Sequence, residues 1–249
     1  MSLNNLMPFL RSHEFIVNLV RTFRRLKYKI QRHNFINCYL KSHPIKKLQI
    51  GAGSNLLEGW LNTDIFPIHE RNVVFLNSTR RFPFEDLTFD YIFSEHQIEH
   101  ISYCEGVHML RECFRVLKPG GKIRISTPNL KFYIELATQN KNDVQIDYIK
   151  WVTDSYIVTG FYRAKNYIPI KNNYKTSFVI NDIFNNYEHK FIYDEETLKE
   201  IIEAAGFIDI TDCKPGQSYD ANLREIDVSM SGMAYFGTMV LEGKRPETS

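Results

Sequence analysis

The 249-residue sequence has few cysteines, and they are scattered. Cys38, Cys104, Cys113 and Cys213 form no C-x-x-C pair, which argues against a disulfide framework and against a cysteine zinc site. Long apolar runs are also missing: none approaches the roughly 18–20 residues of a membrane-spanning helix, and no apolar leader precedes a small-residue cleavage site. We therefore expect a globular, cytoplasmic protein with reduced cysteines and no transmembrane segment.

An excess of one charge is absent overall, since the formal net charge is only +2. The charge is nevertheless uneven, because residues 1–47 hold ten Lys and Arg against the single acid Glu14. Apolar residues recur there at helical spacing: Phe15, Ile16, Leu19, Val20, Phe23 and Leu26. We predict that residues 1–44 are a basic amphipathic arm that packs on the domain. Peripheral contact with a membrane surface or a polyanion is the alternative.

Residues 45–249 alternate strand-like and helix-like segments, which is typical of a mostly parallel sheet flanked by helices. One helix is expected from about Tyr103 until Pro119, Gly120 and Gly121 stop it. A second is expected after Asp194, a good N-cap, and ends at Gly206. The expected strands are 46–50, 61–65, 73–77, 89–94, 121–127, 207–213 and 233–242. The length and the 43% of hydrophobic residues suit a single domain.

The loop after the first strand lacks the third glycine of the dinucleotide fingerprint, because Leu56 stands there. Gly51 and Gly53 still let the backbone turn tightly and approach a ligand. Asp64 ends the next strand, where a carboxylate can accept hydrogen bonds from both hydroxyls of a ribose. The acid comes earlier than in the nicotinamide fingerprint and leaves no room for a full helix. A ribose ligand without a pyrophosphate is therefore favoured over NAD.

Four blocks follow one another along the chain: LQIGAGSN, GWLNTD, FPFEDLTFDYIFSEHQIEH and RVLKPGGKIRISTPN. Together they resemble the class I S-adenosylmethionine-dependent methyltransferases, closely over 46–128 and more loosely over 189–244. The chain is most similar to the small-molecule, methyltransferase type 11-like branch that shares GW-x-N-x-D and EH-x-x-EH. The resemblance implies an α/β fold with a seven-stranded Rossmann-like sheet in the order 3-2-1-4-5-7-6, helices on both faces and an antiparallel last strand.

The same resemblance implies S-adenosyl-L-methionine as cofactor, held along the carboxyl edge of the sheet. The loop that contains Gly51 and Gly53, here called the glycine loop, would contact the methionine part of the cofactor. Asp64 would contact the ribose and Asn77 the adenine. The residues after the fourth strand would flank the methionine part or the sulfonium. The full predicted set is Gly51, Ala52, Gly53, Asp64, Ile65, Asn77, Ser94, Glu95 and His96. Two positions depart from the family, since Gln49 and Asn77 stand where many members have acids.

The stretch SEHQIEH, residues 94–100, concentrates titratable side chains. If it opens a helix, His96 and His100 share one face, and Glu95 and Glu99 share an adjacent one. Three interpretations remain open. In the first, a histidine is the general base or contacts the acceptor. In the second, Glu95 or His96 binds a metal with Glu99 and His100, similar to the E-x-x-E-H cluster of some quinone O-methyltransferases. In the third, these residues cap and brace the helix.

Residues 129–193 contain 14 aromatic residues in 65 positions, twice the density of the rest of the chain. We expect a lid that binds the acceptor, since aromatic walls suit rings or sugars; the alternative is a lid whose aromatics form its own core. Asn181 and His189 precede the returning helix, as in the resembling branch. The predicted catalytic residues are His100, His189 and His96, with no metal assigned.

The predicted function is transfer of a methyl group from S-adenosylmethionine, with an oxygen of a small molecule or glycan as the favoured acceptor. A nicotinamide oxidoreductase is disfavoured by the missing glycine. A nucleic-acid methyltransferase could use the basic arm, but the chain lacks the N-P-P-aromatic motif and the Pro-Cys nucleophile of those enzymes. A non-catalytic cofactor-binding or scaffold protein is the remaining alternative.

Overall fold

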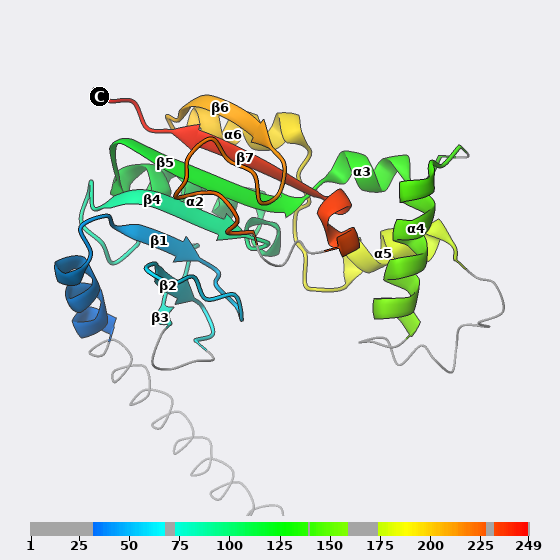
Figure 1. Cartoon of the computed structure of the whole chain (residues 1–249), viewed down its shortest axis with the longest axis horizontal. Helices are drawn as coiled ribbons and strands as arrows, with labels where there is room; N and C mark the ends of the chain where they lie inside the picture. The colour runs from blue at the N-terminus through cyan, green and yellow to red at the C-terminus, as the bar shows by residue number, and fades with distance from the viewer. Residues whose placement is uncertain (1–31, 68–72, 139, 159–173, 228–231, 249) are drawn as a thin grey trace, which may run out of the picture.

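The computed structural model describes residues 32–67, 73–138, 140–158, 174–227 and 232–248. Seven strands form one sheet in the order β3-β2-β1-β4-β5-β7-β6 (Figure 1). Strands β1 to β5 pair in parallel, whereas β7 runs antiparallel to both of its neighbours. The expected order, the antiparallel last strand and the helices on both sides of the sheet are confirmed. The strands are β1 Lys47–Ile50, β2 Leu61–Asp64, β3 Val74–Phe75, β4 Phe89–Glu95, β5 Leu117–Pro128, β6 Ile208–Cys213 and β7 Thr238–Lys244.

Three expected strands differ from the observed ones by more than one residue at an end. Strand β3 has only two residues. Strand β5 begins at Leu117 rather than at 121, because the backbone of Gly120 and Gly121 already exchanges hydrogen bonds with Arg245. The expected strand 233–242 is wrong over its first half: Gly232–Gly237 is a 3-10 helix, η5, and β7 starts only at Thr238. Short apolar runs do not distinguish a helical turn from a strand.

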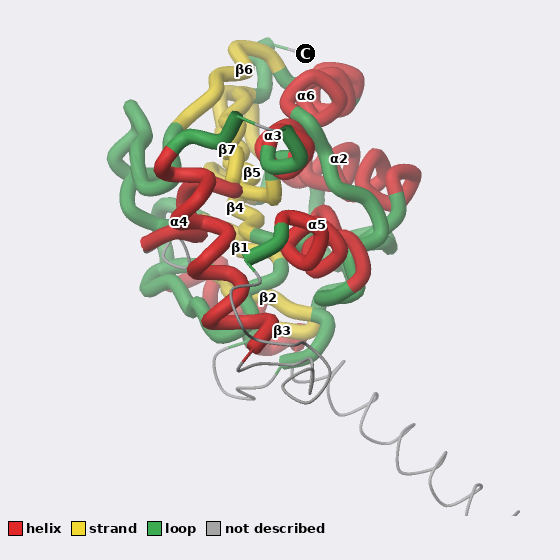
Figure 2. The backbone as a smooth tube through the Cα atoms, turned by 90° about the vertical axis from the view of Figure 1, so that its right-hand side faces the viewer, coloured by secondary structure: helices red, strands yellow, loops and turns green. Residues whose placement is uncertain are grey.

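Helices α2 and α6 lie together on one side of the sheet (Figure 2). Helix α2, Tyr103–Val116, starts at a capping box formed by Ser102 and Glu105. Helix α6, Glu195–Ala204, starts at Asp194, whose Oδ1 accepts from the Thr197 amide at 2.8 Å, as predicted. Both helices contribute fully buried side chains to the main core, so burial of their apolar faces holds them on the sheet.

Residues 214–227 cross in front of β4 and β5 (Figure 1). Leu223 and Ile226 from this segment pack with Phe93 of β4 in a separate apolar cluster. Beside it the guanidinium of Arg124, wholly buried on β5, pairs with Asp227 and with Glu242 of β7. A buried cation requires such partners, so this ion-pair network fixes the segment on the sheet.

The described residues between 130 and 192 form a helical lobe that extends beyond the carboxyl edge of the parallel strands (Figure 1). Its described elements are α3 Leu130–Glu135, α4 Asp143–Val152, the π-helical turn η2 Thr153–Val158 and α5 Thr176–Asn185. Aliphatic and aromatic side chains from these helices form a small core of their own. The aromatic excess of this insertion therefore serves packing at least in part.

The chain enters the sheet through helical residues 32–42. Tyr39 is buried there, and its hydroxyl donates to the carbonyls of Lys47 at 2.9 Å and Gly59 at 3.1 Å. The apolar positions from Phe15 to Leu26 lie outside the described residues, so the packing of the arm stays a prediction. Among the described helices, none combines the length and apolarity needed to span a membrane.

Candidate active site

The loop between β1 and β2 turns through two glycines with left-handed backbone, Gly51 at φ 72° and Gly53 at φ 50°. The amides of Gly51 and Ala52 both donate to the carbonyl of Thr63 at 2.9 Å. A Cβ on Gly51 would lie 2.5 Å from Cγ of Gln97. Apart from Gly53 and its two chain neighbours, no described atom lies within 4 Å of the corresponding position on Gly53, so the loop presents open backbone at the carboxyl edge of the sheet.

Asp64, at the end of β2, lies at the mouth of this loop. Its Oδ2 accepts from the Gly53 amide at 2.9 Å, and its Oδ1 accepts from the Phe66 amide at 2.7 Å. Ile65 and Phe66 next to it are 45% and 75% exposed. At this position a ligand could therefore donate hydrogen bonds to the carboxylate of Asp64 and contact the apolar side chains of Ile65 and Phe66.

Asn77 follows β3 and uses its amide oxygen within its own turn. Its Oδ1 accepts from the amide of Thr79 at 2.9 Å and from the hydroxyl of Thr79 at 2.8 Å. The side-chain NH2 of Asn77 is then the group that could donate a hydrogen bond to a ligand. The amide oxygen already accepts two hydrogen bonds, so it is poorly placed to accept a third from an adenine amino group.

A buried carboxylate reaches the glycine loop from β4. Gln49 donates through Nε2 to the carbonyl of Asn55 at 2.8 Å, and Asn55 donates through Nδ2 to Oε2 of Glu95 at 2.9 Å. Oε1 of Gln49 and Oγ of Ser94 are buried and accept no hydrogen bond from the described residues. Glu95 thus brings a carboxylate to the side of the loop where Gln49 stands in place of the acid that the resemblance implied.

The stretch SEHQIEH does not open an α-helix. His96 has a left-handed backbone with φ 45°, Ile98–His100 is a single 3-10 turn, and α2 begins only at Tyr103. The helix starts later because Ser102 and Glu105 form the capping box. The expectation that His96 and His100 share one helical face is therefore wrong.

His96 pairs with Glu99. Its Nδ1 lies 3.0 Å from Oε1 of Glu99, whose Oε2 accepts from the hydroxyl of Thr127 at 3.0 Å. Burial lowers the pKa of His96, but the hydrogen bond and charge of Glu99 outweigh it, so the pKa is raised overall. Burial raises the pKa of Glu99, and the bond to His96 reverses that shift. Glu99 therefore favours the protonated form of His96, which makes His96 a less suitable base than a neutral histidine.

His189 has the opposite character. Its Nδ1 lies 2.6 Å from the carbonyl oxygen of Ile183. A carbonyl can only accept, so Nδ1 carries the proton and Nε2 of the neutral ring carries the lone pair. Burial lowers the pKa of His189, which keeps the ring neutral at pH 7. The ring packs edge-on against His100, with centroids 4.8 Å apart.

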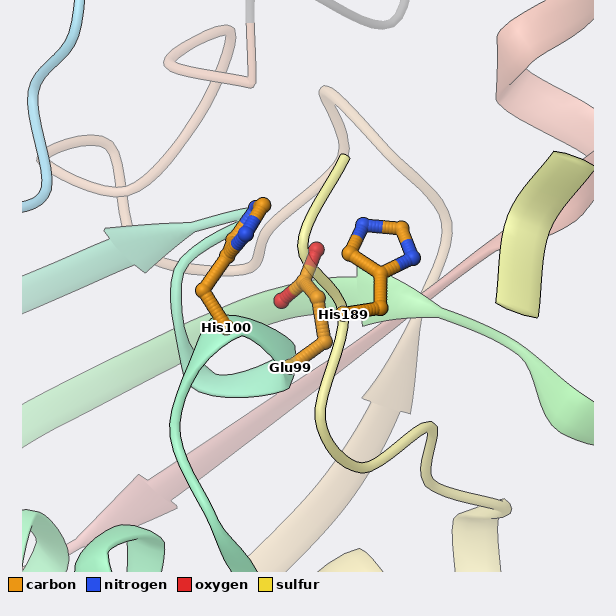
Figure 3. A group of neighbouring side chains, drawn as sticks. All are labelled: Glu99, His100 and His189. Carbon is orange, nitrogen blue, oxygen red and sulfur yellow. The ribbon is translucent and has the colours of Figure 1, made fainter. Parts of the chain in front are cut away.

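Glu99, His100 and His189 gather at one point. Figure 3 shows the carboxylate of Glu99 next to both imidazole rings, and one ligand atom from each residue lies within 4.8 Å of the others. Two imidazoles and a carboxylate suit a divalent transition metal. The set keeps Glu99 and His100 of the metal site considered from the sequence but replaces Glu95 or His96 by His189.

A cavity of about 310 Å³ is lined by this cluster and by the helices of the lobe. Its titratable lining residues are His96, Glu99, His100, Asp182 and His189, and its aromatic ones are Tyr133, Tyr148, Trp151 and Tyr187. Each predicted catalytic histidine therefore borders it, and the lobe's aromatics form a wall as well as a core. Sequence reasoning missed Asp182, although its neighbour Asn181 was singled out; the side chain of Asn181 is exposed and donates to the carbonyl of Ser177.

The family model described as a methyltransferase domain matches residues 65–125. No curated protein matches the sequence significantly. Among solved structures, an S-adenosylmethionine-dependent methyltransferase from Archaeoglobus fulgidus is 18% identical, covers 88% of this chain and 94% of its own, and gives a TM-score of 0.47.

A methyltransferase from Mesorhizobium loti is 12% identical, with coverage of 82% and 92% and a TM-score of 0.48. One from Thermotoga maritima is 14% identical, with coverage of 92% and 96% and a TM-score of 0.46. At these values the likeness does not bear on the acceptor. The fold assignment rests on the strand order itself.

Proposed function

We propose that this chain is a class I S-adenosylmethionine-dependent methyltransferase, in keeping with the methyltransferase-domain model that matches residues 65–125. We propose further that it methylates a hydroxyl of a small molecule or glycan bound in the cavity beneath the helical lobe. His189 is the proposed general base. The observation that supports this most is the hydrogen bond from Nδ1 of His189 to the Ile183 carbonyl, which leaves a basic Nε2 on a ring that lines the cavity.

The residues of the carboxyl edge fit the cofactor. The open backbone at Gly53 and the buried oxygens of Gln49 and Ser94 suit a polar amino-acid portion. Asp64 and the exposed Ile65 suit a nucleoside. When bound, the cofactor supplies a methyl carbon activated by its sulfonium. We propose that these residues hold it, with Glu95 near the ammonium end.

The protein's own chemical task is then alignment of the acceptor and removal of its proton. His189 accepts the hydroxyl proton at Nε2, while the Ile183 carbonyl stabilises the imidazolium through the Nδ1 proton. His96 is locked by Glu99 and fixes the wall of the cavity. The aromatic side chains exclude water and leave flat apolar faces for the acceptor.

The experiment is labelled-methyl transfer to a fractionated metabolite and polysaccharide extract by the parent, His189→Gln and His43→Gln. His43, on the segment before β1, is the control histidine away from the cavity. Loss of a general base lowers turnover by about 10²–10⁴-fold. We expect this loss in His189→Gln only, without a change in S-adenosylhomocysteine affinity.

The pH profile adds an independent readout. Burial lowers the pKa of His189, so the parent's turnover should rise with pH in a limb centred below the ordinary histidine pKa. His189→Gln should lose that limb. Turnover within about threefold of the parent, with the limb retained, would remove His189 from the role of base.

A metal-assisted version of the same transfer is the second candidate, favoured by the convergence of Glu99, His100 and His189. A divalent ion there would lower the pKa of a bound hydroxyl. Loss of activity on chelation, restored by a divalent ion in the parent but not in His100→Gln, would establish this version. Full activity after chelation would eliminate it.

A further inference from the structure

The cavity has a carboxylate, Asp182, that pairs with no Lys or Arg among the described residues. Asp182, on α5, lines the cavity and is only 5% exposed. Its Oδ1 accepts from Nδ2 of Asn186 at 2.9 Å and its Oδ2 from the hydroxyl of Tyr187 at 3.3 Å, both neutral donors. No described Lys or Arg lines the cavity. Glu99, its other acid, is already paired with His96.

Aromatic rings surround the same space. Tyr148 and Trp151 of α4 line the cavity, with ring centroids 5.8 Å apart, and Tyr187 lines it beside Asp182. The negative face of an aromatic ring attracts a cation, most strongly where water is excluded. A buried carboxylate among such rings is the arrangement that binds an ammonium group.

Building on the proposed methyl transfer, we propose that the acceptor carries a protonated amine in addition to its reacting hydroxyl, and that Asp182 binds this ammonium among Tyr148, Trp151 and Tyr187. Amino sugars and amino alcohols are the chemical class. Phosphorylated and carboxylated acceptors are disfavoured, because a second anion beside a buried carboxylate that no described cation pairs would be repelled.

The geometry connects this ammonium site with the base. Tyr187, which bonds Asp182, stacks at a tilt on His189 with centroids 5.5 Å apart. Ile183, next to Asp182 on α5, accepts the bond that sets the tautomer of His189. One short segment therefore holds both groups, so a small molecule can present its ammonium to Asp182 and its hydroxyl to Nε2 of His189.

Burial raises the pKa of Asp182 to about 6, as expected for a carboxylate that lacks a cationic partner. A purely structural role for Asp182 is the competing explanation, since its bonds to Asn186 and Tyr187 brace the end of α5. The two explanations differ in what happens to the binding of charged and uncharged acceptors.

The test compares acceptors that differ only in charge. Labelled-methyl transfer is measured with an extract rich in amino sugars and amino alcohols, before and after N-acetylation with acetic anhydride, which removes the positive charge but keeps the hydroxyls. We expect labelling to fall at least tenfold after acetylation. In Asp182→Asn, KM for the untreated acceptor should rise at least tenfold with a smaller change in kcat.

Asp147→Asn, which removes an exposed carboxylate from α4, is the matched control and should behave as the parent. Undiminished labelling after acetylation, an anionic labelled product, or equal KM values in the two variants would overturn the assignment. A general structural defect would instead lower labelling of all acceptors equally.

A binding measurement that does not depend on methyl transfer tests the ammonium site by itself. Calorimetric titration of the S-adenosylhomocysteine-saturated protein with glucosamine and with N-acetylglucosamine should show tighter binding of the amine, lost in Asp182→Asn. That result without methyl transfer would retain the ammonium site and refute the proposed activity. Equal binding of the two sugars would refute the ammonium site even if methyl transfer occurs.

Discussion

Asp182→Asn should stabilise the ligand-free protein at alkaline pH. Burial raises the pKa of Asp182 from its ordinary value to about 6, so the folded state favours the protonated form and the ionised form opposes folding. This cost is absent below the unfolded-state pKa, near 4, and grows as pH rises from about 4 to 6, where it levels off. Since one pH unit between the two pKa values corresponds to ~1.4 kcal/mol, ionised Asp182 costs about 3 kcal/mol.

Asparagine removes that cost and keeps the shape. Its Oδ1 can still accept from Asn186, and the hydroxyl of Tyr187 can rotate to accept from its NH2. At pH 8 the free energy of unfolding should therefore rise by about 2–3 kcal/mol, or several degrees in Tm for a chain of this size. At pH 4 the gain should largely vanish.

Urea unfolding at pH 4 and pH 8, with Asp147→Asn as control, measures this difference. If Asp182→Asn is less stable than the parent by the same amount at both pH values, the carboxylate braces α5 and the reasoning fails. Greater stability of Asp182→Asn at pH 8 alone is expected if Asp182 serves binding. Its ionised form then destabilises the free protein, and a bound ammonium offsets that cost.

Two other substitutions test the site's frame. Gly51→Ala places a side chain on left-handed backbone, 2.5 Å from Gln97. It should lower the free energy of unfolding by about 1–2 kcal/mol and weaken S-adenosylhomocysteine binding. Stability and titration calorimetry like those of the parent would contradict the close packing. Asp227→Asn leaves Arg124 buried with one carboxylate fewer, so the free energy of unfolding should fall by about 3–5 kcal/mol; a change below 1 kcal/mol in urea would contradict it.

The ends of the helices could be predicted from the sequence, because capping and helix-stopping residues act locally. Asp194 caps α6 as its sequence indicated, and Pro119 follows the helix that it was expected to stop. The strand order could be predicted only through the family resemblance, since periodicity does not say which strands pair. The turn Gly232–Gly237 was missed because its apolar pattern also suits a strand.

The site was predicted in its parts but not in its arrangement. The histidines were found because imidazole is a rare and reactive group, whereas the contact between His100 and His189 depends on where the helical lobe returns to the sheet. The left-handed backbone of His96 gave no signal in the sequence. Asp182 was missed because an acid on a helix is normally solvated, and only the tertiary fold buries it.

The most direct measurement is calorimetric titration of the parent and of Asp64→Ala with S-adenosylhomocysteine. The parent should bind one molecule, and loss of two charge-assisted bonds to the ribose should weaken binding by about 2–4 kcal/mol. Asp64→Asn, which keeps one acceptor oxygen for the loop amides, should fall between them, with the fold intact by circular dichroism. Equal affinity in all three proteins would refute the placement of the ribose, and tight binding of NAD instead would refute the cofactor.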